Sequence, residues 1–70
     1  MNEAITAGQH AMNRVKAGFI LQHTTYRAWC RANDVDPTNG RQAIYGSWNG
    51  PKGRALRARI LSAAGVREAT

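Results

Sequence analysis

The sequence predicts an all-α domain of four helices, and three observations lead to this expectation. Apolar residues near the N-terminus recur at alternating steps of three and four residues, the period of an amphipathic helix. Prolines and glycines then divide the chain into short stretches that carry helix start and stop signals. No stretch reads as a convincing strand. Because 70 residues suffice for one domain, we expect residues 1–70 to form a single compact unit.

The first and longest helix is expected at about residues 1–22. Gly8 and Gly18 each weaken it by about 1 kcal/mol relative to alanine. We expect its apolar stripe to lie in the core, and a dimer seam along the first half of the helix is the alternative. The stripe consists of Ile5, Gly8, Met12, Val15 and Phe19.

The second helix is expected at residues 26–32. Thr24 or Thr25 can cap it, because a hydroxyl oxygen there can accept a bond from a free main-chain N–H group. Three apolar residues share one face of this helix, which we expect to lie in the core: Tyr26, Trp29 and Cys30.

A turn is expected at residues 33–35, since Asn and Asp are the non-glycine residues that best tolerate the left-handed conformation. The third helix should start at Pro37, which suits the first helical position, with Asp36 as its cap. It should end at about Tyr45 or Trp48. Together, residues 25–48 are predicted to form two short helices joined by a tight turn.

A second proline-containing break at residues 49–51 predicts the start of the fourth helix, at about residues 51–65. Gly65 suits the position after the last helical turn. We expect the tail at residues 66–70 to be loose. The apolar face of this helix is predicted to carry Leu56, Ile60 and either Ala63 or Ala64.

Charge gives the strongest indication of a partner. Ten Lys and Arg residues face four Asp and Glu residues, so the net charge is +6 and the pI is about 10.8. Between Arg27 and Arg59 there are seven cations and two acids. A small arginine-rich domain of this pI is typical of a protein that binds a polyanion, although many small proteins are basic without such a partner.

Several function classes are not expected. The single cysteine, Cys30, cannot form an intrachain disulfide, and with His10 and His23 it matches no metal-ligand spacing. No paired carboxylates or placed nucleophile indicates an enzyme, and no cofactor or small-molecule substrate is expected. The chain has no signal-peptide pattern and no apolar run of the roughly 20 residues that cross a bilayer. We therefore expect a cytoplasmic protein without a membrane partner.

Two short helices joined by a tight turn form the frame of a helix-turn-helix, whose second helix lies in the DNA major groove. Small inward residues, here Cys30, Gly40 and Ala43, allow the two helices to approach closely. Arg can address guanine, and Asn or Gln can address adenine, with about 1–3 kcal/mol of discrimination for each good pair. The base-reading residues predicted on the outward face of the third helix are Thr38, Asn39, Arg41, Gln42 and Tyr45.

The loop before the fourth helix predicts a phosphate clamp, because a helix N-terminus offers free N–H groups to an anion and two cations lie beside it. It is not a P-loop, since the Gly-four-residues-Gly-Lys-Ser/Thr pattern is absent. An ordinary turn with solvated charges is the alternative. Trp48, within this loop, is expected to close the core, to face a partner subunit, or to lie against the DNA backbone. The predicted phosphate-binding residues are Arg27, Ser47, Asn49, Lys52 and Arg54.

The stretch from Thr24 to Val66 resembles the lambda-repressor-like helix-turn-helix family, especially short regulators of phages and prophages, and the residues that carry the resemblance are TTYRAWCRANDVDPTNGRQAIYGSWNGPKGRALRARI. The resemblance implies operator binding by a homodimer in a bacterial host cell, where the bound protein would be associated with the nucleoid. Asp34 departs from the family pattern, because glycine is usual at that turn position. Gly40 departs from it as well, because the inward position of the reading helix is usually apolar and larger.

The leading hypothesis is therefore a sequence-specific regulator that binds double-stranded DNA, with half-sites about one helical turn apart. A role in phage recombination, in which the protein bends DNA, is a variant that the sequence does not separate from regulation. The alternative from another class is a small antagonist that places its basic surface on an acidic host protein. Single-stranded nucleic acid is a weaker candidate, because stacking platforms normally stand on strands.

Overall fold

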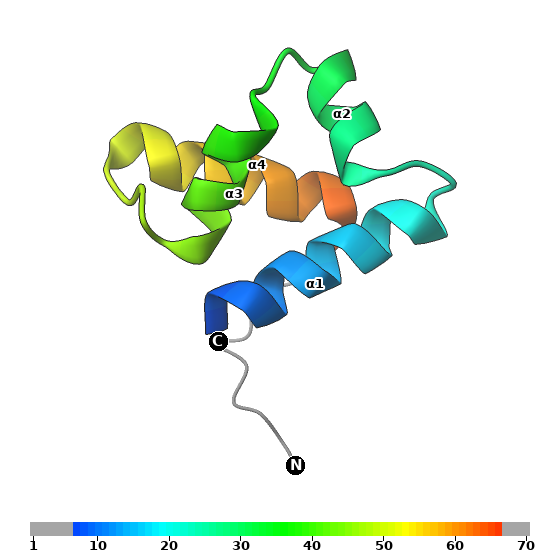
Figure 1. The fold of residues 1–70 in the computed structure, drawn as a ribbon, viewed down its shortest axis with the longest axis horizontal. Helices are drawn as coiled ribbons and strands as arrows, with labels where there is room; N and C mark the ends of the chain where they lie inside the picture. The colour runs from blue at the N-terminus through cyan, green and yellow to red at the C-terminus, as the bar shows by residue number, and fades with distance from the viewer. Residues whose placement is uncertain (1–6, 67–70) are drawn as a thin grey trace.

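The computed structural model describes residues 7–66, which form four helices joined by short turns (Figure 1). No strand occurs within these residues, so the predicted all-α class is confirmed. None of the helices in this part of the chain is both long and apolar enough to span a membrane. The helices are α1 (Ala7–Leu21), α2 (Tyr26–Ala32), α3 (Pro37–Tyr45) and α4 (Pro51–Ala64).

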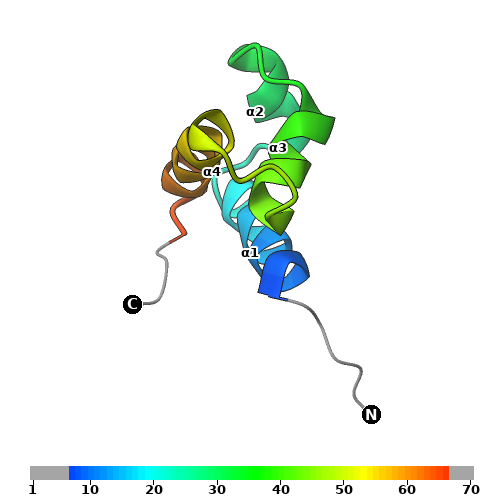
Figure 2. The ribbon, with the colours of Figure 1, turned by 90° about the vertical axis from the view of Figure 1, so that its left-hand side faces the viewer.

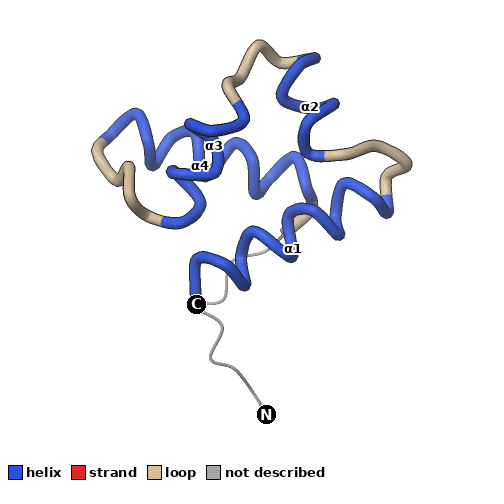
Figure 3. The backbone as a smooth tube through the Cα atoms, in the orientation of Figure 1, coloured by secondary structure: helices blue, strands red, loops and turns tan. Residues whose placement is uncertain are grey.

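Helix α3 packs against both α1 and α4, which also contact each other, and α2 contacts α1 and α3. Figure 2 shows α4 on one side of the molecule and α3 on the other, with α2 at the top. The three connections, at residues 22–25, 33–36 and 46–50, are short enough to hold successive helices beside one another (Figure 3). The second connection joins α2 to α3 and corresponds to the tight turn that the sequence predicts.

The core lies where the four helices meet. Met12, Val15 and Phe19 of α1 are at most 1% exposed, so these three residues of the stripe lie in the core, as expected. Ile5, the first residue assigned to that stripe, lies outside the described residues, as do residues 1–6 of the predicted helix. The other helices complete the core with Tyr26, Cys30, Ile44, Ile60, Leu61 and Ala64.

The predicted helix ends are present. Thr25 caps α2, and its hydroxyl oxygen accepts a 3.1 Å hydrogen bond from the Ala28 N–H group. The Asp36 carboxylate caps α3 by accepting a 2.8 Å bond from the Thr38 N–H group. Helix α4 ends at Ala64, and Gly65 caps it in the left-handed conformation (φ 75°) that glycine permits at this position.

The structure fixes the helix ends that the sequence leaves approximate. Helix α1 ends at Leu21, one residue before the expected end, and His23 lies in the following turn with a φ of 66°. Helix α3 ends at Tyr45, the first of its two expected ends, because Gly46 turns left-handed, so Trp48 lies in the loop. Val66 is not loose: its N–H group donates a 2.9 Å bond to the Leu61 carbonyl, and its side chain packs on the core. The remainder of the predicted tail, residues 67–70, lies outside the described residues.

Candidate nucleic-acid interface

The turn between α2 and α3 reverses the chain through a left-handed residue. Asp34 has a φ of 59°, which confirms that an Asp takes the left-handed position of the predicted turn, where glycine would be less strained. Main-chain bonds close the turn, since the Val35 N–H group donates to the Cys30 carbonyl at 2.8 Å. The Asn33 side chain adds a 2.9 Å bond to the Trp29 carbonyl. The turn therefore holds the start of α3 at one place relative to the end of α2.

A direct hydrogen bond also joins the starts of the two helices. The Tyr26 hydroxyl donates to the Pro37 carbonyl oxygen at 2.6 Å. Gly40 is buried directly beside that hydroxyl, and a Cβ atom at this position would collide with the Tyr26 oxygen. Packing therefore explains why position 40 is a glycine: the Tyr26 phenol of α2 occupies the space that a larger inward side chain would fill.

The outward face of α3 carries all five predicted base-reading residues. Gly40 and Ala43 are buried on the opposite face, as the sequence predicts, together with Ile44. Tyr45, at the end of the helix, is 43% exposed and lies against α1, where its Cδ1 atom is 2.9 Å from the place a Gly8 Cβ would occupy. The exposed residues of this face are Thr38, Asn39, Arg41, Gln42 and Tyr45.

Beside α3 lies a hollow of about 360 Å³, which we call the basic hollow. It brings Arg27, predicted to bind phosphate, together with Arg41, predicted to read a base. Lys16 joins them from α1, and sequence analysis missed it. The spacing of four residues from Lys16 to Ile20 indicates a shared helix face, but nothing in the sequence indicates that α2 and α3 meet this face. The basic hollow is lined by Lys16, Ile20, Thr25, Tyr26, Arg27 and Arg41.

The other predicted phosphate ligands gather at the start of α4. Lys52 and Arg54 are exposed in its first turn, where there is no acidic residue. The cap residue, Gly50, contributes no side-chain hydrogen bond, so no side chain of the cap competes for the first N–H groups of α4. Ser47 and Asn49, in the preceding loop, are also exposed.

Trp48 holds this loop against α4. A Cβ atom on buried Gly53 would collide with the Trp48 carbonyl. The main chain of the loop therefore packs directly against the main chain of α4 at this glycine. Trp48 is half-buried, and it is not among the side chains packed on the main core. Its role is therefore to close the loop onto the first turn of α4, rather than to close the core as expected.

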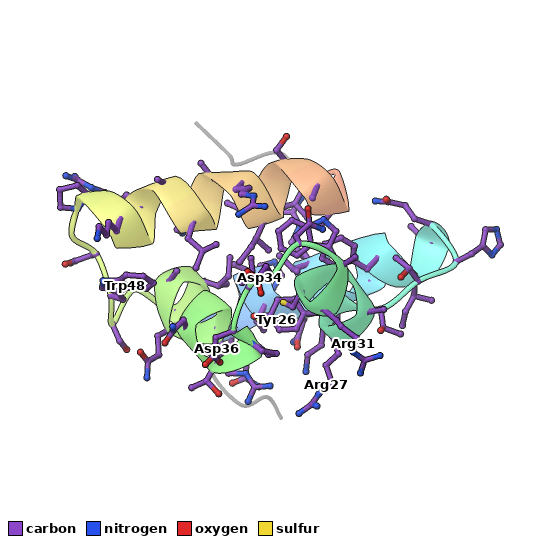
Figure 4. All side chains as sticks on the ribbon, turned by 90° about the horizontal axis from the view of Figure 1, so that it is seen from above. Tyr26, Arg27, Arg31, Asp34, Asp36 and Trp48 are labelled. Atoms are coloured by element: carbon purple, nitrogen blue, oxygen red, sulfur yellow. The ribbon has the colours of Figure 1, made fainter. Side chains whose placement is uncertain are left out.

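The predicted phosphate ligands thus form two groups, with α3 between the start of α2 and the start of α4 (Figure 1). Figure 4 shows Arg27 and Arg31 pointing to the same side of the molecule, where Asp36 also lies, while Trp48 is at the far end of α3. Residues 7–66 contain nine Lys and Arg residues and two Asp residues. One of the two acids, Asp36, is engaged as the cap of α3.

Arg59 lies against α2, away from the outward face of α3. Its guanidinium carbon is 5.5 Å from the centroid of the Trp29 ring, and one of its nitrogens is 3.5 Å from the Asn33 side-chain oxygen. The Trp29 ring is partly buried and stacks on Phe19 with a centroid distance of 5.7 Å. Arg59 therefore helps to hold α4 against α2, and its charge is directed to an aromatic face.

The contact between α2 and α3 contains two groups that burial keeps neutral. Burial raises the pKa of Tyr26 well above its ordinary value, and the neighbouring Cys30 contributes to the rise. Burial likewise raises the pKa of the Cys30 thiol, which is fully buried, as expected of a small core residue. At neutral pH the charges at this surface are therefore those of the exposed cations and Asp residues.

Comparisons with protein-family models, with curated proteins and with solved structures find no match to this chain.

Proposed function

We propose that the protein binds double-stranded DNA in a sequence-specific manner, with α3 in the major groove. The observation that carries the proposal is the outward face of α3, where five exposed polar side chains stand on a helix that is locked to α2. Asn39 and Gln42 can each form a pair of hydrogen bonds with adenine, and Thr38 can bond to either base type. An α-helix fits the width of the major groove.

The cations support the proposal by their placement on both sides of α3. Arg27 stands at the start of α2, and Lys52 and Arg54 stand at the start of α4. Contacts of this kind with phosphates set the register and orientation of a protein on the duplex, while base edges supply the sequence information. The free N–H groups of α4 would add to the phosphate contacts on that side.

The resemblance to lambda-repressor-like regulators supports a role as a regulator of phage or prophage type that acts as a homodimer. A single helix-turn-helix buries little DNA surface, so two copies on two half-sites are needed for useful specificity. Sedimentation velocity with and without duplex would test this part of the proposal. A single copy on the selected site would contradict it.

Selection from a pool of random duplexes tests the proposed function. The wild-type chain is expected to enrich one short motif, and Gln42→Ala is expected to lose the preference at one position of that motif. Lys52→Ala should keep the motif and weaken binding to all duplexes alike, since a phosphate contact carries no sequence information. A wild-type chain that enriches no motif would contradict the proposal. Salt-insensitive binding to an acidic host protein would then favour the antagonist.

A further inference from the structure

We propose that the basic hollow binds one phosphate group of the DNA backbone, and that Arg41 therefore grips the backbone instead of reading a base edge. The inference rests on the proposed function and deepens it. It assigns Lys16 to the DNA interface. It also replaces the base-reading role that the sequence predicts for Arg41 with a contact to the DNA backbone.

The first support is the convergence of three cations from three different helices. Lys16 comes from α1, Arg27 from α2 and Arg41 from α3, and all three line the same hollow of about 360 Å³. None of the residues that line it carries a carboxylate. An anion placed in this hollow would be attracted by all three cationic side chains, and no lining residue would repel it.

The second support is that the two hydroxyl groups lining the hollow already form hydrogen bonds within the protein. The Tyr26 hydroxyl donates its hydrogen to the Pro37 carbonyl, so the phenol supplies the wall of the hollow and not a donor. The Thr25 hydroxyl accepts from the Ala28 N–H group, and a hydroxyl that accepts one bond can still donate another. The donors among the lining residues are therefore mostly cationic, which favours a phosphate over a neutral group.

The third support is the apolar wall. Ile20 is 64% exposed and borders the hollow beside the cations. A phosphate of the DNA backbone is flanked by deoxyribose carbons, which can pack against an aliphatic side chain, whereas free inorganic phosphate has no apolar part. The pairing of cations with Ile20 thus favours a backbone phosphate over the free ion.

The position of Arg41 on α3 decides between its two roles. Arg41 and Gln42 point about 100° apart around the helix axis. Gln42 lies on the side opposite the buried face, while Arg41 is turned toward α2 and lines the hollow. The charge of Arg41 also reaches the Tyr26 phenol, where it opposes the rise in pKa that burial causes. Direct readout then falls to Asn39 and Gln42, which favour adenine.

The test measures the salt dependence of binding to the duplex selected by the wild-type chain, using the full chain. Lys16→Gln, Arg27→Gln and Arg41→Gln each remove one cation of the hollow. The triple variant is expected to lower the magnitude of the slope of log K against log salt by about 0.9, the value for one lost phosphate contact, and each single variant should lower it by part of that amount. Arg14→Gln is the matched control, because Arg14 is exposed on the same helix as Lys16 but borders a different hollow, between α1 and α4. Its slope is expected to equal that of the wild type.

The role of Arg41 is tested by repeating the selection with Arg41→Ala. A backbone contact carries no sequence information, so binding should weaken while the enriched motif stays unchanged. Loss of a preferred guanine at one position would overturn the assignment, because an arginine that reads a base edge pairs with guanine. Inorganic phosphate should compete with duplex no better than chloride at equal ionic strength. Stronger competition would make free phosphate the ligand and overturn the backbone assignment.

The failure of this inference is distinguishable from the failure of the proposed function. If the wild-type chain enriches a motif but the three hollow variants keep the slope of Arg14→Gln, only the basic hollow is refuted as a phosphate site. If the wild-type chain binds no duplex, both fail. Circular dichroism melts of each variant would establish that the fold is retained, which is expected because the three substituted side chains are exposed.

Discussion

The hydroxyl of Tyr26, the first residue of α2, donates a 2.6 Å hydrogen bond to the carbonyl oxygen of Pro37, the first residue of α3. The bond thus joins the start of α2 to the start of α3, while the turn at residues 33–36 links the end of α2 to the start of α3. Gly40 leaves the space in which the phenol lies. The orientation of the α3 outward face relative to the basic hollow therefore depends on one tyrosine and one glycine.

Tyr26→Phe should destabilise the domain by about 1 kcal/mol, the net contribution of one hydrogen bond. For a chain of this length the melting temperature should fall by about 4–8 °C. Thermal unfolding followed by circular dichroism measures the change. An unchanged melting temperature would show that the bond to Pro37 contributes nothing to folding.

Gly40→Ala should destabilise the wild-type chain by about 1–3 kcal/mol, because the new methyl group meets the Tyr26 oxygen. In a Tyr26→Phe background the same change should cost less, since that oxygen is gone and alanine favours the helix by about 1 kcal/mol. A double-mutant cycle in urea measures the difference. Additive effects of the two substitutions would contradict this packing.

Stability should fall at alkaline pH. Tyr26 and Cys30 both have raised pKa values in the folded state, caused first by burial, so the unfolded chain loses these protons more readily. The free energy of unfolding should therefore decrease above about pH 8.5, where the unfolded thiol ionises, and further above about pH 10, where the unfolded phenol does. Urea titrations from pH 7 to 11 measure this dependence. Tyr26→Phe combined with Cys30→Ala should flatten it, and an equally steep dependence in that variant would point to other groups.

Arg59→Gln and Lys52→Gln should separate stability from DNA binding. The first removes the cation from the Trp29 face and should cost about 0.5–1 kcal/mol of stability, with the salt slope of duplex binding unchanged. The second should leave stability unchanged and lower the slope by about 0.9. Urea unfolding and salt-dependent anisotropy on both variants provide the comparison. A lower slope for Arg59→Gln would place that arginine on the DNA.

Much of the fold was predictable because local chemistry marks the helix ends. Thr25 and Asp36 act as caps, Pro37 opens α3, and Gly65 ends α4, each as the residue type indicates. Asp34 was predictable in the turn because Asp tolerates the left-handed conformation. The buried faces of α1 and α3 followed from the helical period. Such signals need no knowledge of how the helices pack.

The features that depend on packing were not predictable. A side chain at position 40 would collide with the Tyr26 hydroxyl, and one at position 53 would collide with the Trp48 carbonyl. Only folding brings these groups close to Gly40 and Gly53. In the sequence, Lys16 is one of ten Lys and Arg residues, and nothing there sets it apart. Its place beside Arg27 and Arg41 follows only from the packing of α1 against α2 and α3. Leu61 was missed as a core residue because it lies beside the stripe expected for α4.

The most direct test of the account is a fluorescence-anisotropy titration of the wild-type chain. It would use the duplex selected from the random pool and a scrambled duplex of the same length, at two salt concentrations. If α3 reads base edges, binding to the selected duplex should be at least about 10³-fold tighter, as sequence-specific proteins show. Weak, equal and steeply salt-dependent binding to both duplexes would mean that the contact is only electrostatic, and would contradict the assignment of α3 as a reading helix.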